Sequence, residues 1–333
     1  MMAHKVITII GSLNTDLVTL TPRVPIGGET LTATSFSTGP GGKGANQAVG
    51  AVRLSRTNPH TTSTPSTSDV TVKMVGAVGA DEFGPSLVNG MKADGIDTSG
   101  VRIIDGLSTG VAVILVEEES GENRILLNPG ANHVLRPEDF LTAESLGSPL
   151  PDLIILQLEI PLETVLQIIK TAKKEGVDVL LNPAPAVKLP KDVFEGLAHL
   201  IVNESEAAIL TGRKAEDVEV EGFDWNVVTN DFVENGVKNV VVTLGSKGAF
   251  FASQDLGGKG IFVKAEKVEK VVDTTAAGDT FVGAYAVGVV RKSGQKVGEE
   301  DVRLACRAAG RTVEKKGAQS AIPWENEVER KTS

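Results

Sequence analysis

The segment Val271–Tyr285 (VVDTTAAGDTFVGAY) places a carboxylate beside a loop of small residues. A short apolar run ends at Asp273, and we expect a helix to begin near Asp279 and to continue to about Val290. Backbone N–H groups at such a helix start can bind phosphate, because the small side chains of residues 274–278 leave them accessible. A nearby carboxylate would repel phosphate unless a hydroxyl proton or a cation lay between them, as a phosphoryl-transfer base requires. The alternative is that Asp279 only caps the helix.

A second glycine cluster, GPGGKGAN at residues 39–46, opens the predicted helix Ala45–Leu54. It matches G-x-G-x-x-G, but a dinucleotide fingerprint should close the first strand, and strand Val6–Ile10 is followed by GSLN instead. It is not a P-loop, because Lys43 is followed by glycine. GGKG recurs at residues 257–260, where we expect a hairpin turn. The first copy differs in the helix that it opens and in the two amides that follow it, Asn46 and Gln47, which together with the ammonium of Lys43 suit a polyhydroxylated ligand.

Polar residues follow four successive predicted strands in the second half of the chain. In an open parallel sheet, ligands bind outside the carboxyl ends of the strands. Any one of these residues could be a helix cap or a turn residue, but four such positions along one edge favour a binding site. The residues are Gln157, Glu159, Asn182, Asn203, Glu206, Thr243, Gly245 and Ser246.

The sequence motifs of a zinc site are missing. The four histidines are scattered without the H-x-x-x-H spacing of a zinc hydrolase, and there is no cysteine cluster.

The elements that must position these residues alternate along the chain. Short β-branched runs recur, and the segment Leu162–Lys174 has a helical apolar face and ends before Gly176. Strand and helix alternate from about residue 150 onward, which predicts an α/β fold with a parallel sheet and helices on both faces. Residues 16–38 and 109–127 lack this alternation and predict a small separate β-sheet. The Thr/Ser/Pro-rich tract 56–69 is expected to be a flexible insertion.

The composition is that of a globular protein. The chain has 333 residues, of which 41% are hydrophobic and 23% charged. Its 36 glycines are about one residue in nine, above the average glycine content of about 7%. The net charge of −10 argues against broad nucleic-acid binding, and no apolar run approaches the roughly 20 residues of a membrane span. The single cysteine, Cys306, allows no intrachain disulfide, and no signal-peptide pattern opens the sequence. We therefore expect a cytoplasmic protein, with nuclear access also compatible.

Eight segments, taken in order, resemble the ribokinase family of ATP-dependent sugar kinases. They are GSLNTD (11–16), GGKGAN (41–46), LQLE (156–159), LNPAPA (181–186), NESEA (203–207), TLGSKG (243–248), DTTAAGDTF (273–281) and KKGAQSAIPW (315–324). The resemblance covers nearly the whole chain, apart from residues 56–69 and part of 213–231, which look like insertions. It implies one carbohydrate kinase domain over residues 1–333. The implied fold is a three-layer α/β/α sandwich with a mainly parallel sheet and a small β-sheet lid.

The implied reaction is ATP-dependent phosphorylation of D-ribose at O5. Asp279 matches the family's catalytic base, which takes the O5 proton, and Ala276, Ala277 and Gly278 match its anion hole. The residues that match the sugar site, in addition to Asp279, are Asn14, Thr15, Asp16, Gly42, Lys43, Gly44, Ala45, Asn46 and Glu159.

The resemblance also implies ATP, Mg²⁺ and a monovalent cation, usually K⁺. Glu206 matches the carboxylate that organises Mg²⁺ through water. The nucleotide positions are Asn203, Thr243, Leu244, Gly245, Ser246, Lys247, Gly248, Gly278 and Cys306, although Cys306 could equally be a small packed residue of a helix over 302–313. The monovalent-cation positions are Asp273, Thr275, Thr312, Lys315, Gly317 and Ala321. A hydroxyl is common at the last position, whereas this chain has Ser320 one residue earlier.

Two other functions stay open at this point. The chain could phosphorylate another sugar or a nucleoside, such as deoxyribose, fructose or adenosine, or it could be a sugar-binding sensor without catalysis. The polar residues predicted to bind the sugar favour a compact polyol over a purine nucleoside, because a purine would need aromatic side chains to stack on. The presence of Asp279 and Glu206 argues against a sensor without catalysis. Besides ribose and ATP, the expected partner is a second copy of the chain, joined through the lids. No nucleic acid or membrane partner is expected.

Overall fold

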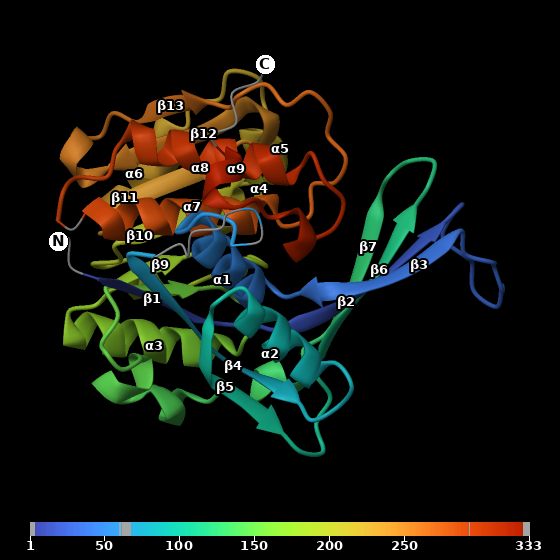
Figure 1. Cartoon of the computed structure of the whole chain (residues 1–333). Helices are drawn as coiled ribbons and strands as arrows, with labels where there is room; N and C mark the ends of the chain where they lie inside the picture. The colour runs from blue at the N-terminus through green and yellow to red at the C-terminus, as the bar shows by residue number, and fades with distance from the viewer. Residues whose placement is uncertain (1–3, 60, 62–67, 293, 329–333) are drawn as a thin grey trace.

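The computed structural model describes residues 4–59, 61, 68–292 and 294–328. Half of the predicted insertion at 56–69, residues 60 and 62–67, lies outside the described residues. A nine-stranded sheet forms the middle layer of the main body, in the order β13-β12-β11-β10-β9-β8-β1-β4-β5 (Figure 1). Its strands are β1 (Lys5–Ile10), β4 (Val70–Gly79), β5 (Asp97–Ile104), β8 (Leu153–Leu156), β9 (Asp178–Leu181), β10 (His199–Asn203), β11 (Asn239–Thr243), β12 (Gly248–Ser253) and β13 (Ile261–Lys264).

The sheet is parallel from β5 to β11, as predicted, but its last two pairings are not. β11 with β12 and β12 with β13 are antiparallel. The sheet is therefore mainly parallel, as the resemblance implied, with two antiparallel pairings at this edge. The connections explain the difference, because a short turn between neighbouring strands permits only an antiparallel hairpin. The second GGKG lies in the β12–β13 connection, as predicted.

Helices cover both faces of the sheet, which confirms the predicted three-layer sandwich. One core cluster packs α1 (Lys43–Leu54), α2 (Gly84–Ala93), α7 (Ala277–Lys292) and α8 (Glu299–Thr312) against alternate strand residues such as Ile7 and Ile9. The other packs α3 (Leu162–Glu175), α4 (Glu204–Thr211) and α6 (Asn226–Glu234) against the intervening residues such as Ile154 and Leu156. The period of two along each strand divides the apolar side chains between the layers.

The remaining helical segments are short. They are α5 (Ala215–Val218), α9 (Glu325–Val328) and the 3₁₀ turns 130–134, 137–140, 143–146, 191–193, 245–247, 254–256 and 319–321. Within the described ranges, no helix combines the length and apolarity needed to cross a bilayer.

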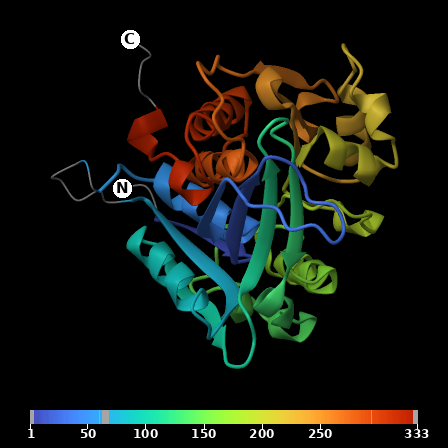
Figure 2. The same cartoon turned by 90° about the vertical axis from the view of Figure 1, so that its right-hand side faces the viewer.

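A second, four-stranded sheet projects from the main body, in the order β3-β2-β6-β7 (Figures 1 and 2). Its strands are β2 (Asn14–Thr21), β3 (Ser35–Gly41), β6 (Gly110–Glu117) and β7 (Asn123–Asn128). This is the small sheet predicted from residues 16–38 and 109–127. β2 begins four residues after β1 ends, and β3 ends two residues before α1 begins, so the base of this sheet is fixed at the carboxyl edge of the main sheet.

Candidate active site

Asp279 lies in the first turn of α7, with its side chain 8% exposed. Its two carboxylate oxygens accept hydrogen bonds from α1: Asn46 Nδ2 donates to Oδ2, and Gln47 Nε2 donates to Oδ1, each at 2.9 Å. The carboxylate is therefore bound across to another helix. These contacts, rather than the capping of α7, account for the position of its side chain.

Close packing of two helices brings these groups together. α1 and α7 meet at Gly50 and Gly283, where a Cβ on Gly283 would lie 2.6 Å from the backbone of Gly50 and Ala51. Only glycine permits this approach. The contact brings the start of α1, from the first glycine cluster, beside the start of α7, from the small-residue loop.

Glu159 forms a second polar centre, in the loop after β8. Its Oε2 accepts from Ser12 Oγ at 2.6 Å, from the Lys43 backbone N–H at 3.0 Å and from Asn14 Nδ2 at 3.4 Å. Ser12 was not singled out in the sequence, although it lies within the GSLNTD segment. Three distant segments of the chain thus meet at one carboxylate.

Ser12 also accepts hydrogen bonds from the backbone of two residues that were predicted to contact the sugar. The N–H of Gly44 donates to Ser12 Oγ at 3.2 Å, and the N–H of Ala45 donates to Ser12 O at 2.9 Å. Gly42 has a φ of 88°, and a Cβ there would lie 2.7 Å from the Asn14 backbone nitrogen. Gly42, Gly44 and Ala45 therefore fasten the start of α1 to the loop after β1.

Asn132 is a site residue that the sequence analysis missed. Its amide bonds both backbone groups of Leu13, and its Nδ2 donates to Asn14 Oδ1 at 2.7 Å. Asn14 therefore has a fixed orientation, with its own Nδ2 toward Glu159. Asn132 lies in a 3₁₀ turn with no motif around it, so no sequence signal indicated this contact. Thr15, the next predicted residue, is buried.

Electrostatic interactions in the site connect four carboxylates and one ammonium. Burial, together with the charges of Glu159 and Asp279, raises the pKa of Asp16 to about 7. Gly41 leaves room for Asp16, since a Cβ on Gly41 would lie 2.3 Å from its oxygens. Burial alone would lower the pKa of Lys43, but the negative charges of Asp279, Glu159 and Glu206 outweigh it and the pKa is raised. Lys43 is therefore charged and lies among the carboxylates.

The loop before α7 has a conformation that suits an anion. Ala276 has a φ of 59°, in the left-handed region that residues with a side chain rarely adopt. A left-handed residue next to a helical one directs successive N–H groups to one side, which forms an anion-binding hollow. The N–H of Ala277 donates to Thr274 O at 3.3 Å, whereas those of Ala276 and Gly278 bond no acceptor among the described residues.

A cavity of about 870 Å³ lies beside this helix start. It is lined by three segments that lie far apart in the sequence. Burial raises the pKa of the Cys306 thiol in its wall to about 11, so this thiol stays neutral. Its lining includes Thr243, Gly245, Ser246 and Gly248 after β11, Ala277, Gly278 and Phe281 of α7, and Cys306, Ala309 and Gly310 of α8. Most of the predicted nucleotide positions are thus brought together.

Three predicted nucleotide residues are placed differently. Among the described residues, Asn203, Leu244 and Lys247 do not line this cavity. Leu244 is buried in the core, and Lys247 lies 3.4 Å from Glu204.

Asn203 and Glu206 cap the helix α4. Asn203 Oδ1 accepts from the Glu206 N–H and Glu206 Oε2 accepts from the Asn203 N–H, both at 2.8 Å. Burial raises the pKa of Glu206, against the opposing effects of the Asn203 N–H and of Lys43. The capping alternative considered for residues after strands therefore holds for both.

Three of the predicted monovalent-cation residues, Asp273, Thr275 and Gly317, are joined by hydrogen bonds, although Gly317 lies 44 residues after Asp273 in the sequence. Asp273 Oδ1 accepts from the Thr275 N–H and hydroxyl at 2.9 and 2.7 Å, and its Oδ2 accepts from the Gly317 N–H at 2.9 Å. Burial alone would raise the pKa of Asp273. These hydrogen bonds and the charge of Lys316 outweigh burial, and the net effect is a lowered pKa. The carboxylate is therefore kept charged.

Thr312 and Lys315 lie in and just after the end of α8. The Thr312 hydroxyl donates to Thr280 Oγ1 at 2.8 Å, and its carbonyl accepts from the Lys315 N–H at 3.1 Å. The Lys315 ammonium lies 3.3 Å from Glu327.

Ala321 is buried and has no hydroxyl to offer. Ser320, one residue earlier, is exposed, and its hydroxyl donates to Lys316 O at 3.2 Å. Ser320 therefore does not supply a hydroxyl at the place of Ala321. The turn that contains both residues is held by α1, since Arg53 Nη1 donates to the carbonyls of Gln319 and Ile322.

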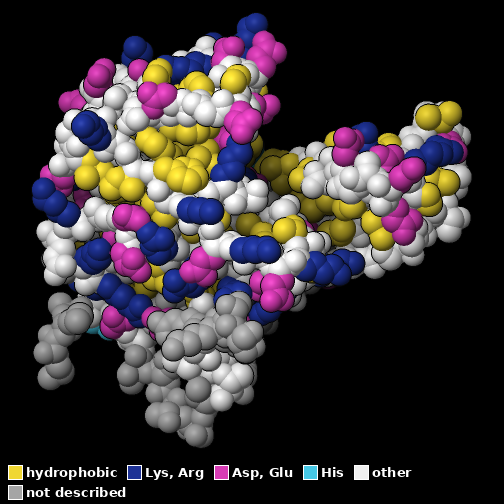
Figure 3. Space-filling view, turned by 90° about the horizontal axis from the view of Figure 1, so that it is seen from above, with side chains coloured by type: hydrophobic (Ala, Val, Ile, Leu, Met, Phe, Trp, Pro, Cys, Tyr) yellow, Lys and Arg dark blue, Asp and Glu magenta, His cyan; other side chains and the backbone are white. Residues whose placement is uncertain are grey.

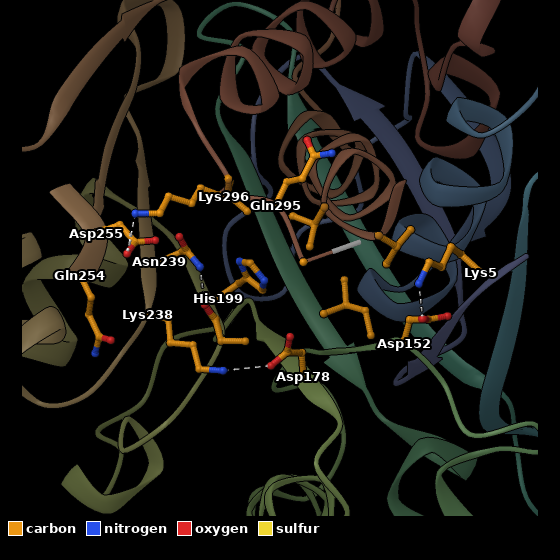
Figure 4. Close-up of a pocket in the computed structure, with 16 residues that line it drawn as sticks. Lys5, Asp152, Asp178, His199, Lys238, Asn239, Gln254, Asp255, Gln295 and Lys296 are labelled. Atoms are coloured by element: carbon orange, nitrogen blue, oxygen red, sulfur yellow. Dashed lines mark hydrogen bonds and ion pairs between the residues drawn. The ribbon is translucent and has the colours of Figure 1, made fainter. Parts of the chain in front are cut away.

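A second cavity, of about 470 Å³, lies at the opposite edge of the main sheet, where the strands begin (Figure 4). Burial lowers the pKa of His199 in its wall to about 4, so this ring is neutral, and Nδ1 lies 3.0 Å from the Tyr285 hydroxyl. The lysines of its lining are ion-paired, as Lys5 with Asp152, Lys238 with Asp178, and Lys296 with Asp255. The predicted site residues lie at the other edge.

Known proteins resemble this chain in sequence and in fold. The model of the pfkB family carbohydrate kinases matches residues 5–325. A ribokinase from Schizosaccharomyces pombe is 44% identical over 97% of this chain and 96% of its own, and a deoxyribokinase from Salmonella typhi is 38% identical over 95% of each. The structure of Arabidopsis thaliana ribokinase complexed with ribose and ATP superposes with a TM-score of 0.82, at 31% identity over 98% of each chain. The chain belongs to the pfkB family of carbohydrate kinases.

Proposed function

We propose that this kinase transfers the γ-phosphoryl group of ATP to O5 of D-ribose. The observation that carries the proposal is the position of Asp279. Its buried carboxylate accepts hydrogen bonds from Asn46 and Gln47, and it directly follows Ala277 and Gly278, which line the cavity of about 870 Å³. The ribose and ATP complex of a relative with the same fold supports the choice of substrates.

The polar cluster has the chemistry of a sugar site. Asp16 and Glu159 can accept hydrogen bonds from sugar hydroxyls, while Asn14 and Lys43 can donate hydrogen bonds to hydroxyl oxygens. Asn46 Oδ1 is buried and bonds no donor among the described residues, so a sugar hydroxyl would satisfy it. A purine would find no exposed aromatic partner in Tyr285, Trp225 or Trp324, since all three are buried.

In this proposal Asp279 is the general base. It takes the proton of the attacking hydroxyl, and the N–H groups at Ala276 and Gly278 stabilise the charge that develops on the transferred group. Phosphoryl transfer depends mainly on positioning and on charge stabilisation, so a base and an anion hole can supply most of what the protein must contribute. The ammonium of Lys43 adds positive charge where three carboxylates would otherwise repel the phosphate.

Two cations fit the residues present. Glu206 has a half-buried carboxylate near Lys43 and Asp279, and a carboxylate suits Mg²⁺ bound through water. Bound Mg²⁺ would neutralise phosphate charge. Asp273 stays ionised beside Thr275 and Gly317, which suits a monovalent cation held by a carboxylate and backbone carbonyls.

The proposal extends to the assembly and the compartment. The projecting sheet carries exposed apolar residues, Phe36, Ile125 and Leu126 among them, and Figure 3 shows hydrophobic side chains along this arm. We propose that it closes over the sugar as a lid and that two lids join a homodimer. The single cysteine supports a reducing, cytoplasmic location.

An ATP-consumption assay against ribose, deoxyribose, fructose and adenosine, each with K⁺ or Na⁺, tests the proposal. We expect ribose to give the highest kcat/KM and K⁺ to raise the rate over Na⁺. Deoxyribose is the strongest competitor, because of the deoxyribokinase relative. Adenosine as the best substrate would refute the choice of sugar, and no turnover with any of them would favour a sensor. Equal rates in K⁺ and Na⁺ would show that Ala321 costs the chain its cation activation.

A further inference from the structure

A chain of three amides connects the main sheet to Asp279; those of Gln47 and Gln157 are fully buried, and that of Asn182 is half-buried. Gln157 Nε2 donates to Gln47 Oε1 at 2.6 Å, and Gln47 Nε2 donates both to Asp279 Oδ1 and to Asn182 Oδ1, each at 2.9 Å. Asn182 Nδ2 in turn donates to the carbonyl of Ile201 in β10, at 2.9 Å. Each amide is thus held by the next, and the last is held by the sheet backbone.

We propose that Gln47 is a positioning residue for phosphoryl transfer, and that Gln157 and Asn182 keep its amide nitrogen directed at Asp279. An ionised carboxylate only accepts hydrogen bonds, so the amide nitrogen of Gln47 must face it. If the Gln47 amide were reversed, its oxygen would lie against the oxygens of Asp279 and Asn182, and its nitrogen against the nitrogen of Gln157. The neighbours on both sides therefore select one orientation.

This orientation fixes the carboxylate. Asn46 donates to one oxygen of Asp279 and Gln47 to the other, which prevents rotation of the carboxylate plane. The remaining lone pairs then have a fixed direction in which they can meet a substrate hydroxyl. Gln47 is fully buried, and its two amide atoms already bond protein groups, so it acts on the reaction through Asp279 and not by contact with the sugar.

The protein keeps this chain at a cost, which argues for a function beyond packing. Gln157 is fully buried, and its Oε1 bonds no donor among the described residues. A buried acceptor without a partner destabilises the fold. Gly11 makes room for it, since a Cβ there would lie 2.0 Å from Gln157 Oε1. An apolar side chain would fill this space without the unpaired oxygen, but it could not hold Gln47.

The test compares Gln47→Met, Gln157→Met and the double variant, with ribose and ATP as substrates. Methionine keeps the length of glutamine but cannot donate a hydrogen bond. We expect Gln47→Met to lower kcat by about tenfold to a hundredfold, as small misplacements of reacting groups do, with the KM for ribose changed less than about threefold. Because Gln157 acts only through Gln47, the double variant should be no slower than Gln47→Met alone.

Gln167→Met is the matched control. Gln167 is half-buried and donates to Thr171 in α3, away from the site, so its kcat should stay at the wild-type value. Purely structural damage would raise KM and lower kcat together, and the losses of the two single variants would add. That pattern, or a wild-type kcat in folded Gln47→Met, would overturn the proposal. If Gln47→Met does not fold, a wild-type kcat in Gln157→Met overturns it instead.

The inference about Gln47 rests on the proposed role of Asp279 as the general base. The same assay can show which of these two roles fails. Asp279→Asn with an unchanged kcat would overturn the role of Asp279 itself. A strongly slowed Asp279→Asn together with a wild-type Gln47→Met would leave that role intact and overturn only the positioning by Gln47.

Discussion

Individual polar residues in this kinase are buried at positions where folding alone would favour apolar ones. Asp279, Asn46 and Gln47 are all buried at the contact between two helices. Charged groups in such places cost free energy unless they are hydrogen-bonded, and here each carboxylate oxygen has a donor. The chemistry at these residues and their cost to stability can therefore be measured separately.

Replacing the proposed base tests the chemistry. Asp279→Asn keeps the size of the side chain and removes its basicity, so we expect kcat to fall by at least about a hundredfold, as for loss of a general base. Ribose binding should stay measurable by calorimetry, because the other sugar-binding groups remain. A kcat within the error of the wild type would refute the mechanism.

Asp16 ties stability to pH. Its pKa is about 7 in the folded protein against 3.8 for the free side chain, so the folded state holds this proton more tightly than the unfolded state. Its contribution to stability is complete below pH 3.8 and is lost as the pH rises to about 7. Asp16→Asn should therefore raise the melting temperature at pH 8, and the gain should shrink toward pH 4.

Thermal unfolding without ligands, from pH 4 to pH 8, measures the effect of Asp16→Asn. Glu119→Gln, at an exposed position of the β6–β7 connection, is the control and should show no such trend. A variant that is less stable than the wild type at pH 8 would contradict the burial effect assigned to Asp16.

At the scale of elements, the site depends on how closely α1 approaches α7. Gly283→Ala would place a methyl group 2.6 Å from the α1 backbone, and such overpacking typically costs about 1–3 kcal/mol. We expect a lower melting temperature and also a lower kcat, because the shift separates Asn46 and Gln47 from Asp279.

Gly90→Ala in α2 is the matched control for the packing of α1 and α7. A Cβ there has open space, and alanine in a helix gains about 0.5–1 kcal/mol over glycine. A rise in stability for Gly90→Ala with a fall for Gly283→Ala would support the role of the close contact. Equal changes in both variants would contradict it.

The local patterns in the sequence predicted most elements but not their long-range partners. The apolar runs of β1, β8 and β10, and the helix ended by Gly176, were predicted because period and end signals are local. β13 was missed, and β5 was missed because its polar start DTSG breaks the apolar pattern. Asn132 and Ser12 were missed because their importance depends on contacts across more than a hundred residues.

The whole molecule consists of a three-layer body and one projecting sheet. This sheet exposes apolar residues on both of its faces: Leu126 is 70% exposed on one face, and Ile125, 56% exposed, lies on the other. Exposed apolar surface of this kind indicates a contact with another surface. The lid and dimer proposals each account for one face.

Sedimentation should show whether the chain is a dimer in solution. We expect a mass of twice 34.8 kDa, and we expect either Leu126→Lys or Ile125→Lys to reduce it by half, depending on which face the partner covers. Val220→Lys, at an exposed position outside the projecting sheet, should leave the mass unchanged. A monomeric wild type would refute the dimer.

The long separation between Asn46 and Asp279, 233 residues, has a consequence for how the enzyme is made. During synthesis, Asn14, Lys43 and Glu159 leave the ribosome well before α7 exists. Until then the apolar face of α1 has no partner helix, and a chain stopped there would expose it to aggregation. A newly made chain therefore completes its proposed sugar-binding groups early, whereas under the proposed mechanism it can phosphorylate only after α7 has packed against α1.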